Sequence, residues 1–413
     1  MKLATKNNLH LTYCTNIHPG ETWAEVESNL KQYIPPLKSR LSPHEPFGIG
    51  LRLAQIAAQE LLTGDNLAQF KAWLESEDLY VFTLNGFPFG GFHHQVVKDQ
   101  VYAPDWTKSD RLNYTLQLIE ILTVLLPDHL DGGISTLPLS YKPWWRNTQA
   151  QEQVLQLASL NLAQAIAKLA EVKQTTGKLI HLDLEPEPDG MLENTQEIID
   201  YFQNYLIPLA SKYLQTQLGI DSVTAADWIR EYIRVCYDTC HFAVEYEQPE
   251  DIIQSFQAAS IKIGKIQLSS AIKIAIPREL DQRQAVLAQL TPFVESTYLH
   301  QVIANHGGGN LKHYDDLGDA LKHFLTTDAR EWRTHFHVPI FIADYQLFKS
   351  TQEHISQLLQ MLPHNAIAQH LEIETYTWEV LPPAMKLDIS TSIEREYQWI
   401  LSTIQSTNSI NKI

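Results

Sequence analysis

Short runs of apolar residues alternate along the chain with longer segments in which apolar residues recur every three or four positions. The short runs indicate strands at 9–15, 48–53, 79–84, 132–139, 178–185, 233–238, 263–269 and 370–378. The longer segments between most of them are typical of amphipathic helices. Eight strands with intervening helices predict an α/β protein with a TIM (β/α)8 barrel more than an open sheet. A Rossmann fold is disfavoured because no G-x-G-x-x-G follows the first strand.

This regular alternation breaks down between the seventh and eighth strands, at about 270–369. No Pro/Gly/Ser-rich linker bounds this segment, so we expect a long insertion at the C-terminal face of the barrel and not a separate domain. The whole chain, 1–413, is then a single barrel domain. Its polar last residues, about 406–413, predict a flexible tail.

Two of the predicted strands carry acidic residues where a barrel strand is normally apolar. In IHLDLEPE the alternation places His181, Asp183 and Glu185 on one face, and in HLEIET it places Glu372 and Glu374 on one face. If the intervening leucines and isoleucine pack against helices, these carboxylates point into the barrel. A buried carboxylate must be paired, hydrogen-bonded or bound to metal, although each strand end alone could equally be a structural salt bridge.

Further candidate ligands follow other strands. RVCYDTCHFAV ends a buried strand in Asp238 and His241, and WRTHFHVPIF carries His335 and His337 two positions apart, on one face if the segment is extended. The histidine pair alone could also be aromatic filler. Polar residues at the C-terminal ends of barrel strands converge on one site. Mixed imidazole and carboxylate ligands suit Zn²⁺, Mn²⁺ or Fe²⁺ better than Ca²⁺. The predicted metal ligands are Glu185, Asp238, His241, His335, His337 and Glu374.

Four other polar residues are weaker candidates for contact with a substrate. His18 follows the first strand, and His93 lies with His94 in the glycine-rich segment LNGFPFGGFHH, which is either a lid or a plain surface loop. Gln267 lies late on the seventh strand. His300 is flanked by apolar residues, and a core histidine is the other interpretation of it.

Charge and cysteine content restrict the possible partners. The net charge is −17 and no Lys/Arg-rich run occurs, so we expect no nucleic-acid ligand. Three cysteines, Cys14, Cys236 and Cys240, form no disulfide framework and favour a reducing compartment. The first residues lack the apolar core of a signal peptide, and no run of 18 apolar residues predicts a membrane span. We therefore expect a cytoplasmic protein; the pattern gives no oligomeric state.

The segment DTCH resembles the xylose isomerase-like barrel superfamily, which includes sugar-phosphate isomerases and epimerases and the endonuclease IV group. That resemblance implies metal ligands at a strand-five Glu, a strand-six Asp-x-x-His, a strand-seven His and a strand-eight Glu. Glu185, Asp238, His241 and Glu374 match this pattern, and His335 or His337 could supply the loop ligands before the last strand. Gln267 replaces the strand-seven His, which puts a full three-metal site in doubt.

The sequence is also similar to the EboE-type metabolite traffic family, through LNGFPFGGFH, LDLEPEPDG, VCYDTCHFAVEYE, YLHQV, WRTHFHVP and LEIETYTWEVLP. That resemblance implies handling of a precursor in secondary metabolism, for example in sunscreen-pigment (scytonemin-like) gene clusters. It adds a biological setting and little mechanism.

These observations favour a metal-dependent isomerase or epimerase acting on a small hydroxy-carbonyl or polyol metabolite. A divalent ion would polarise a carbonyl or hydroxyl group, and Glu185 and Glu374 would move the proton. One alternative is a non-catalytic metabolite-binding or traffic protein, which Gln267 slightly favours. A second alternative, an endonuclease IV-like phosphodiesterase, is disfavoured by the acidic charge.

Overall fold

A computed structural model of the chain describes residues 1–413 except 4–6, 94, 363–364, 383–384, 387 and 411–413. Eight parallel strands form one sheet in the order β1-β13-β7-β6-β5-β4-β3-β2. They are β1 (His10–Tyr13), β2 (Phe47–Arg52), β3 (Leu79–Asn85), β4 (Gly132–Thr136), β5 (Ile180–Leu184), β6 (Ile233–Asp238), β7 (Ile263–Leu268) and β13 (His370–Ile373). Each lies within, or one residue beyond, a run predicted from the sequence. The predicted TIM barrel is confirmed.

The sheet curls into a barrel that is nearly closed between β1 and β2. The remaining seam holds a single parallel bridge between Cys14 and Gly50. The hydroxyl of Thr12 adds to it, because it donates to the main-chain oxygen of Gly48 and accepts from the main-chain nitrogen of Gly50. A side chain thus replaces part of the main-chain ladder at this edge.

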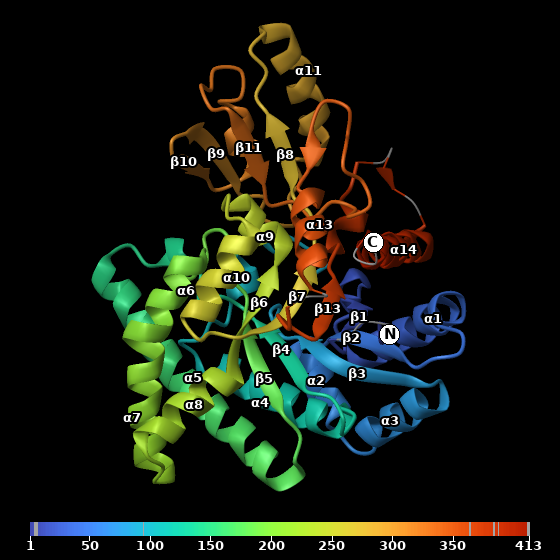
Figure 1. Cartoon of the computed structure of the whole chain (residues 1–413), viewed down its shortest axis with the longest axis vertical. Coiled ribbons are helices and arrows are strands. Elements are labelled where there is room, and N and C mark those ends of the chain that lie inside the picture. The colour runs from blue at the N-terminus through green and yellow to red at the C-terminus, as the bar shows by residue number, and fades with distance from the viewer. Residues whose placement is uncertain (4–6, 94, 363–364, 383–384, 387, 411–413) are drawn as a thin grey trace.

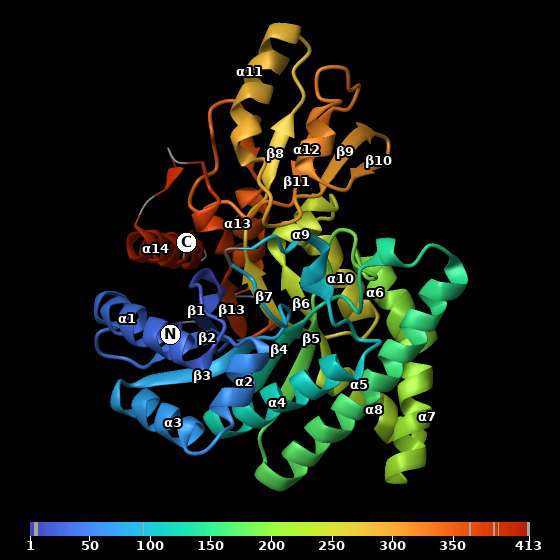
Figure 2. The ribbon, with the colours of Figure 1, turned by 180° about the vertical axis from the view of Figure 1, so that it is seen from behind.

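Helices surround the barrel and alternate with its strands (Figures 1 and 2). They are α1 (Trp23–Leu41), α2 (Gln55–Leu61), α3 (Asn66–Ser76), α4 (Ser109–Leu125), α5 (Thr148–Thr176), α6 (Thr195–Tyr201), α7 (Ile207–Leu218), α8 (Ser222–Tyr232), α9 (Thr239–Val244), α10 (Pro249–Ala258), α13 (Gln352–Met361) and α14 (Ile389–Ile410). A π turn, η4 (Phe202–Leu206), joins α6 to α7. Among the described residues, every helix is too short or too polar to traverse a lipid bilayer.

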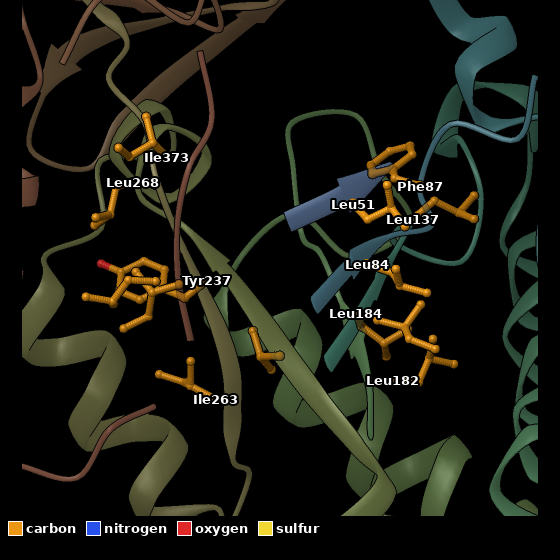
Figure 3. Packing of buried hydrophobic residues seen from close by; sticks show 14 of the residues in the cluster. Leu51, Leu84, Phe87, Leu137, Leu182, Leu184, Tyr237, Ile263, Leu268 and Ile373 are labelled. Atoms are coloured by element: carbon orange, nitrogen blue, oxygen red, sulfur yellow. The ribbon is translucent and has the colours of Figure 1, made fainter. Parts of the chain in front are cut away.

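Alternation along each strand separates the barrel interior from the layer beneath the helices. Figure 3 shows Leu84, Leu182 and Leu184 gathered on one side of the barrel and Leu268 and Ile373 on the other. The residues between these apolar positions, including His181 and Asp183 on β5, face the barrel interior and are fully buried. The interior is therefore unusually polar, as the strand patterns predict.

The segment between β7 and β13 builds a second sheet above the end of the barrel where α9 and α13 lie (Figures 1 and 2). Its five antiparallel strands follow the order β10-β9-β11-β8-β12. They are β8 (Ile272–Ala275), β9 (Val302–Gly307), β10 (Asn310–Tyr314), β11 (Glu331–Thr334) and β12 (Lys349–Ser350), accompanied by α11 (Leu280–Leu290), η5 (Thr291–Phe293) and α12 (Leu317–Leu321).

The predicted insertion, 270–369, thus contains two different parts. The added sheet ends at β12, whereas α13 packs between α10 and α14 as an ordinary barrel helix. At the end of the chain, α14 continues to Ile410, into the segment expected to be a tail. The description of the chain as one domain stays a prediction.

Candidate metal centre

The six predicted metal ligands lie together at the C-terminal end of the barrel. Glu185 follows β5, Asp238 ends β6, His241 lies in α9, His335 and His337 follow β11, and Glu374 follows β13. All six side chains are buried. The insertion therefore returns to the barrel mouth at the HFH segment, which brings two of its histidines to the candidate ligands supplied by barrel strands.

The potential ligand atoms of these six side chains lie close enough to one another to surround a single ion. Nε2 of His241 lies 3.9 Å from Oδ1 of Asp238, and its Nδ1 lies 4.0 Å from Oε1 of Glu185. One ligand atom each from Asp238, His241 and His337 lie within 4.8 Å of one another. A single ion with bond lengths of about 2.0–2.2 Å could bridge atoms at such separations.

Each of the three histidines has its Nδ1 atom next to a protein oxygen. Nδ1 of His241 lies 3.0 Å from the main-chain oxygen of Pro186, and Nδ1 of His337 lies 2.7 Å from the main-chain oxygen of Glu374. A carbonyl oxygen only accepts, so Nδ1 carries the proton in both rings and Nε2 presents a lone pair. Metal-binding histidines are oriented in this way.

The third ring, His335, is oriented by Gln301. Nδ1 of His335 lies 2.9 Å from Oε1 of Gln301, whose Nε2 donates to the main-chain oxygen of Pro188 at 3.0 Å. This second bond fixes which end of the amide faces the imidazole. The amide oxygen must accept from Nδ1, and Nε2 of His335 is again left as a lone pair.

Asp238 is held in a comparable way through one carboxylate oxygen. It caps α9, and its Oδ1 accepts from the main-chain nitrogens of Cys240 and His241 and from the hydroxyl of Ser269. Its other oxygen, Oδ2, is buried without a hydrogen-bond partner. The strand-to-helix turn after β6 therefore fixes the carboxylate and leaves one oxygen for a ligand.

Buried polar atoms without a partner are rare in folded proteins, and here several lie in one place. They include Oε2 of Glu185, Oδ2 of Asp238 and the Nε2 atoms of His335 and His337. The oxygen of Asp238 and the two imidazole nitrogens are all acceptors, so these three atoms cannot satisfy one another. A divalent cation would satisfy all of them, and the mixed nitrogen and oxygen donor set fits Zn²⁺, Mn²⁺ or Fe²⁺.

Burial and neighbouring charges shift the pKa values of these groups in different directions. Burial, followed by repulsion between neighbouring carboxylates, raises the pKa values of Glu185 and Glu374 well above the ordinary glutamate value. Burial alone would raise the pKa of Asp238, but His241, His337 and Ser269 lower it below its usual value. Burial lowers the pKa of His241 to about 4, so its ring is neutral and able to bind metal at physiological pH.

A cavity of about 60 Å³ adjoins this group of ligands. Two amides on its wall, from Asn16 and Asn85, each donate to Oε1 of Glu374 at 3.0 Å. Much of the remaining lining is aromatic: Phe87, Phe92, Tyr102, Tyr298 and Tyr376. The cavity is therefore suited to a small molecule with polar groups toward Glu374 and an apolar face toward the rings.

The four predicted substrate contacts lie outside this lining. Both ring nitrogens of His300 are engaged, by the main-chain oxygen of His335 and by Glu295, so His300 supports the ligand segment. His18 stacks on Tyr33 and lines a separate small cavity. His93 lines a third cavity, and Gln267 lies on β7 inside the barrel, where Cys236 donates to it. His94 lies outside the described residues.

Sequence reasoning did not single out Glu187, Asn85 or Gln301. Oε2 of Glu187 lies 4.0 Å from Nε2 of His241. Glu187, His241 and His335 form another set of potential ligands at the barrel mouth, which shares two histidines with the first. The alternation of LEPEP, two residues beyond Glu185, could have indicated Glu187, and the polar end of FTLN could have indicated Asn85. Nothing local in the sequence distinguishes Gln301.

No protein-family model and no curated protein matches the sequence. Among solved structures, the fold is similar to a xylose isomerase-like TIM barrel protein from Mycobacterium smegmatis in complex with magnesium. The two are 9% identical, over 98% of this chain and 99% of that chain, with a TM-score of 0.50.

Two other solved structures are more distant. A D-allulose 3-epimerase from Methylomonas sp. is 9% identical over 98% of this chain and 100% of that chain, with a TM-score of 0.47. A probable 3-DHS dehydratase from Bacillus anthracis is 11% identical over 94% and 98%, with a TM-score of 0.42. The fold of the chain is that of a xylose isomerase-like TIM barrel.

Proposed function

We propose that this barrel is a metal-dependent isomerase or epimerase acting on a small hydroxy-carbonyl or polyol metabolite. One observation carries the proposal: the buried ligand atoms that lack partners converge beside a small cavity, and Asp238, His335 and His337 are each fixed through the other polar atom of the side chain. The similarity to the EboE-type sequence pattern supports a setting in secondary metabolism.

A divalent ion held by Asp238, His241, His335 and His337 would act as a Lewis acid on a substrate oxygen. Glu185 and Glu374 come from β5 and β13, which β6 and β7 separate in the sheet, so they reach the cavity from different sides. Burial and the neighbouring carboxylates raise the pKa values of both glutamates, which favours groups that can hold and return a proton. Asn16 and Asn85 orient the carboxylate of Glu374, and aromatic side chains form an apolar wall of the cavity.

The test is exchange of the proton next to a substrate carbonyl. The protein, loaded in turn with Zn²⁺, Mn²⁺ or Fe²⁺, would be incubated in D₂O with a panel of small ketoses and hydroxy-ketones. NMR would follow deuterium incorporation and new epimers. Glu374→Gln should abolish exchange without changing the circular dichroism, whereas Glu152→Gln, on the exposed face of α5, should leave it unchanged. Unchanged exchange in Glu374→Gln would remove Glu374 from the mechanism.

A carrier without catalysis is the second candidate. Gln267 favours it slightly, because the strand-seven position supplies no imidazole and lies beneath the cavity instead of lining it. Tight metabolite binding without deuterium exchange for any metal and substrate in the panel would support the carrier and contradict the isomerase.

A further inference from the structure

A second group of potential metal ligands lies at the opposite end of the barrel from the mouth. Asp131 precedes β4, His181 lies near the start of β5 and His370 begins β13. One ligand atom from each of these three residues lie within 4.8 Å of one another. The two imidazoles are buried, stacked with centroids 5.5 Å apart, and Asp131 is 18% exposed.

His181 is oriented as a metal ligand. Its Nδ1 lies 2.6 Å from Oδ1 of Asp183, so the carboxylate accepts the hydrogen bond from Nδ1 and fixes the ring. Its Nε2 points toward Asp131, 3.6 Å from Oδ2, and has no hydrogen-bond partner although the ring is fully buried. Gly133 and Gly264 leave the space that this His–Asp pair occupies, because a Cβ at Gly264 would lie 2.0 Å from Oδ1 of Asp183.

Asp131 is fixed through one oxygen, as Asp238 is at the mouth. Its Oδ2 accepts from Arg234 at 3.3 Å. Its Oδ1 has no hydrogen-bond partner, even though Nε2 of His370 is only 3.2 Å away. Ligands bound tetrahedrally at about 2.0–2.1 Å are about 3.4 Å apart, close to the 3.2 Å between Nε2 of His370 and Oδ1 of Asp131. Nε2 of His181 lies 3.6 Å from Oδ2, the other oxygen of the same carboxylate, so both imidazoles face Asp131.

We propose that Asp131, His181 and His370 hold a second divalent cation, of the Zn²⁺ type, at the N-terminal end of the barrel. A cavity of about 650 Å³, lined by Asp131 and Arg234 among others, opens onto this end and gives solvent access to the fourth coordination position. The ion links β5 to β13, which are not neighbours in the sheet. Its role is structural, because catalytic groups of TIM barrels lie at the other end.

The test counts metal ions in protein stripped with a chelator and then titrated with Zn²⁺ against a chromophoric competitor. Wild type should bind two equivalents. His335→Gln/His337→Gln, which removes two ligands at the mouth, should still bind one, and that ion should raise the melting temperature of this variant. Co²⁺ in the same variant should give the intense visible absorption of a tetrahedral site.

Variants of two proposed ligands, Asp131 and His370, locate the ion, and a variant of Arg234 is the control. Asp131→Asn and His370→Gln should each bind one equivalent fewer than wild type. Arg234→Gln removes the partner of Asp131 without removing a ligand and should retain the ion. If His335→Gln/His337→Gln binds no metal, and Asp131→Asn and His370→Gln bind as much as wild type, the proposal is overturned and His181 holds a proton between Asp131 and Asp183 instead.

Discussion

Nδ1 of His337 lies 2.7 Å from the main-chain oxygen of Glu374, so a ring from the insertion is hydrogen-bonded to the residue that follows the last barrel strand. The hydroxyl of Thr377 in turn donates to the main-chain oxygen of His337. The contact that docks the insertion is therefore also the contact that sets the His337 tautomer. A displaced insertion would disturb the proposed metal ligands even if the barrel kept its fold.

Gln301 should control metal affinity without touching the metal. Gln301→Ala removes the acceptor for Nδ1 of His335, so the ring is free to rotate and to change tautomer. Loss of such an orienting partner typically lowers metal affinity about 10–100-fold. Competition with a chromophoric chelator measures this change at the mouth site.

The matched control is Gln301→Glu, which keeps an oxygen facing His335 and should retain more affinity than Gln301→Ala. Equal affinity in wild type and Gln301→Ala would show that the hydrogen bond does not orient the ligand. A loss of the same size in both variants would assign the effect to the bond from Gln301 to Pro188.

Removing one member of the ion pair between Lys265 and Glu372 should destabilise the fold more than replacing both members. Both side chains are fully buried in the barrel, with Nζ 2.8 Å from Oε2, and Nζ also contacts Ser135. Lys265→Met leaves a carboxylate uncompensated, and we expect a loss of about 3–5 kcal/mol in the free energy of unfolding. Denaturant unfolding measures it.

The double variant Lys265→Met/Glu372→Leu separates pairing from packing. Replacing both charges by apolar groups of similar volume is often neutral or stabilising, so the double variant should be more stable than Lys265→Met alone. If the double variant loses as much stability as Lys265→Met and the single variant Glu372→Leu together, the pair makes no direct contribution, and the cost comes from filling the polar interior with apolar groups.

The barrel could be predicted from sequence because its signal is local. In IHLDLE, period-two alternation alone separates Leu182 and Leu184, beneath the helices, from Asp183, inside the barrel. The fold of the insertion could not be predicted in this way. Its strands β8 and β11 pair across more than fifty residues, and β12 contributes only Lys349–Ser350, too short for any periodicity to appear.

The residues of the candidate site also fall into those that local sequence identifies and those that only tertiary structure identifies. Residues at strand ends, such as Asp238 and Glu374, could be identified because every parallel strand of a barrel delivers its C-terminal end to one mouth. His300 shows the limit: its apolar neighbours identify it as buried, but only tertiary structure shows that it bonds to His335 and Glu295. Gln301, the next residue, orients His335 through contacts that local sequence does not encode.

Glu396 should make stability depend on pH. It lies in α14, where its Oε1 accepts from Thr375 and from the main chain of Ile340, and burial raises its pKa from 4.5 to about 8. The folded protein keeps this proton up to about pH 8, while the unfolded chain releases it near pH 4.5. The stabilisation is thus fully present below pH 4.5 and is lost as pH rises to about 8.

Glu396→Gln keeps the accepting oxygen and cannot ionise, so it should remove this dependence. Relative to wild type, it should gain about 1.4 kcal/mol per pH unit across the window between the two pKa values. Urea unfolding at a series of pH values measures the difference. A constant difference from pH 5 to pH 8 would mean that Glu396 is already ionised in the folded protein.

Gly264 should tolerate no side chain, because the barrel interior is filled at that point. A Cβ there would lie 2.0 Å from Oδ1 of Asp183 and 2.7 Å from Nδ1 of His181, and these two side chains are hydrogen-bonded to each other and fully buried. Neither can move away without breaking that bond. We expect Gly264→Ala to lower the free energy of unfolding by about 1–3 kcal/mol, the usual cost of overpacking.

Gly90→Ala is the control, since nothing lies within 4 Å of its Cβ position and it should be neutral or slightly stabilising. Equal stability of the two variants would mean that the His–Asp pair has room to shift, and that Gly264 is not required for its placement.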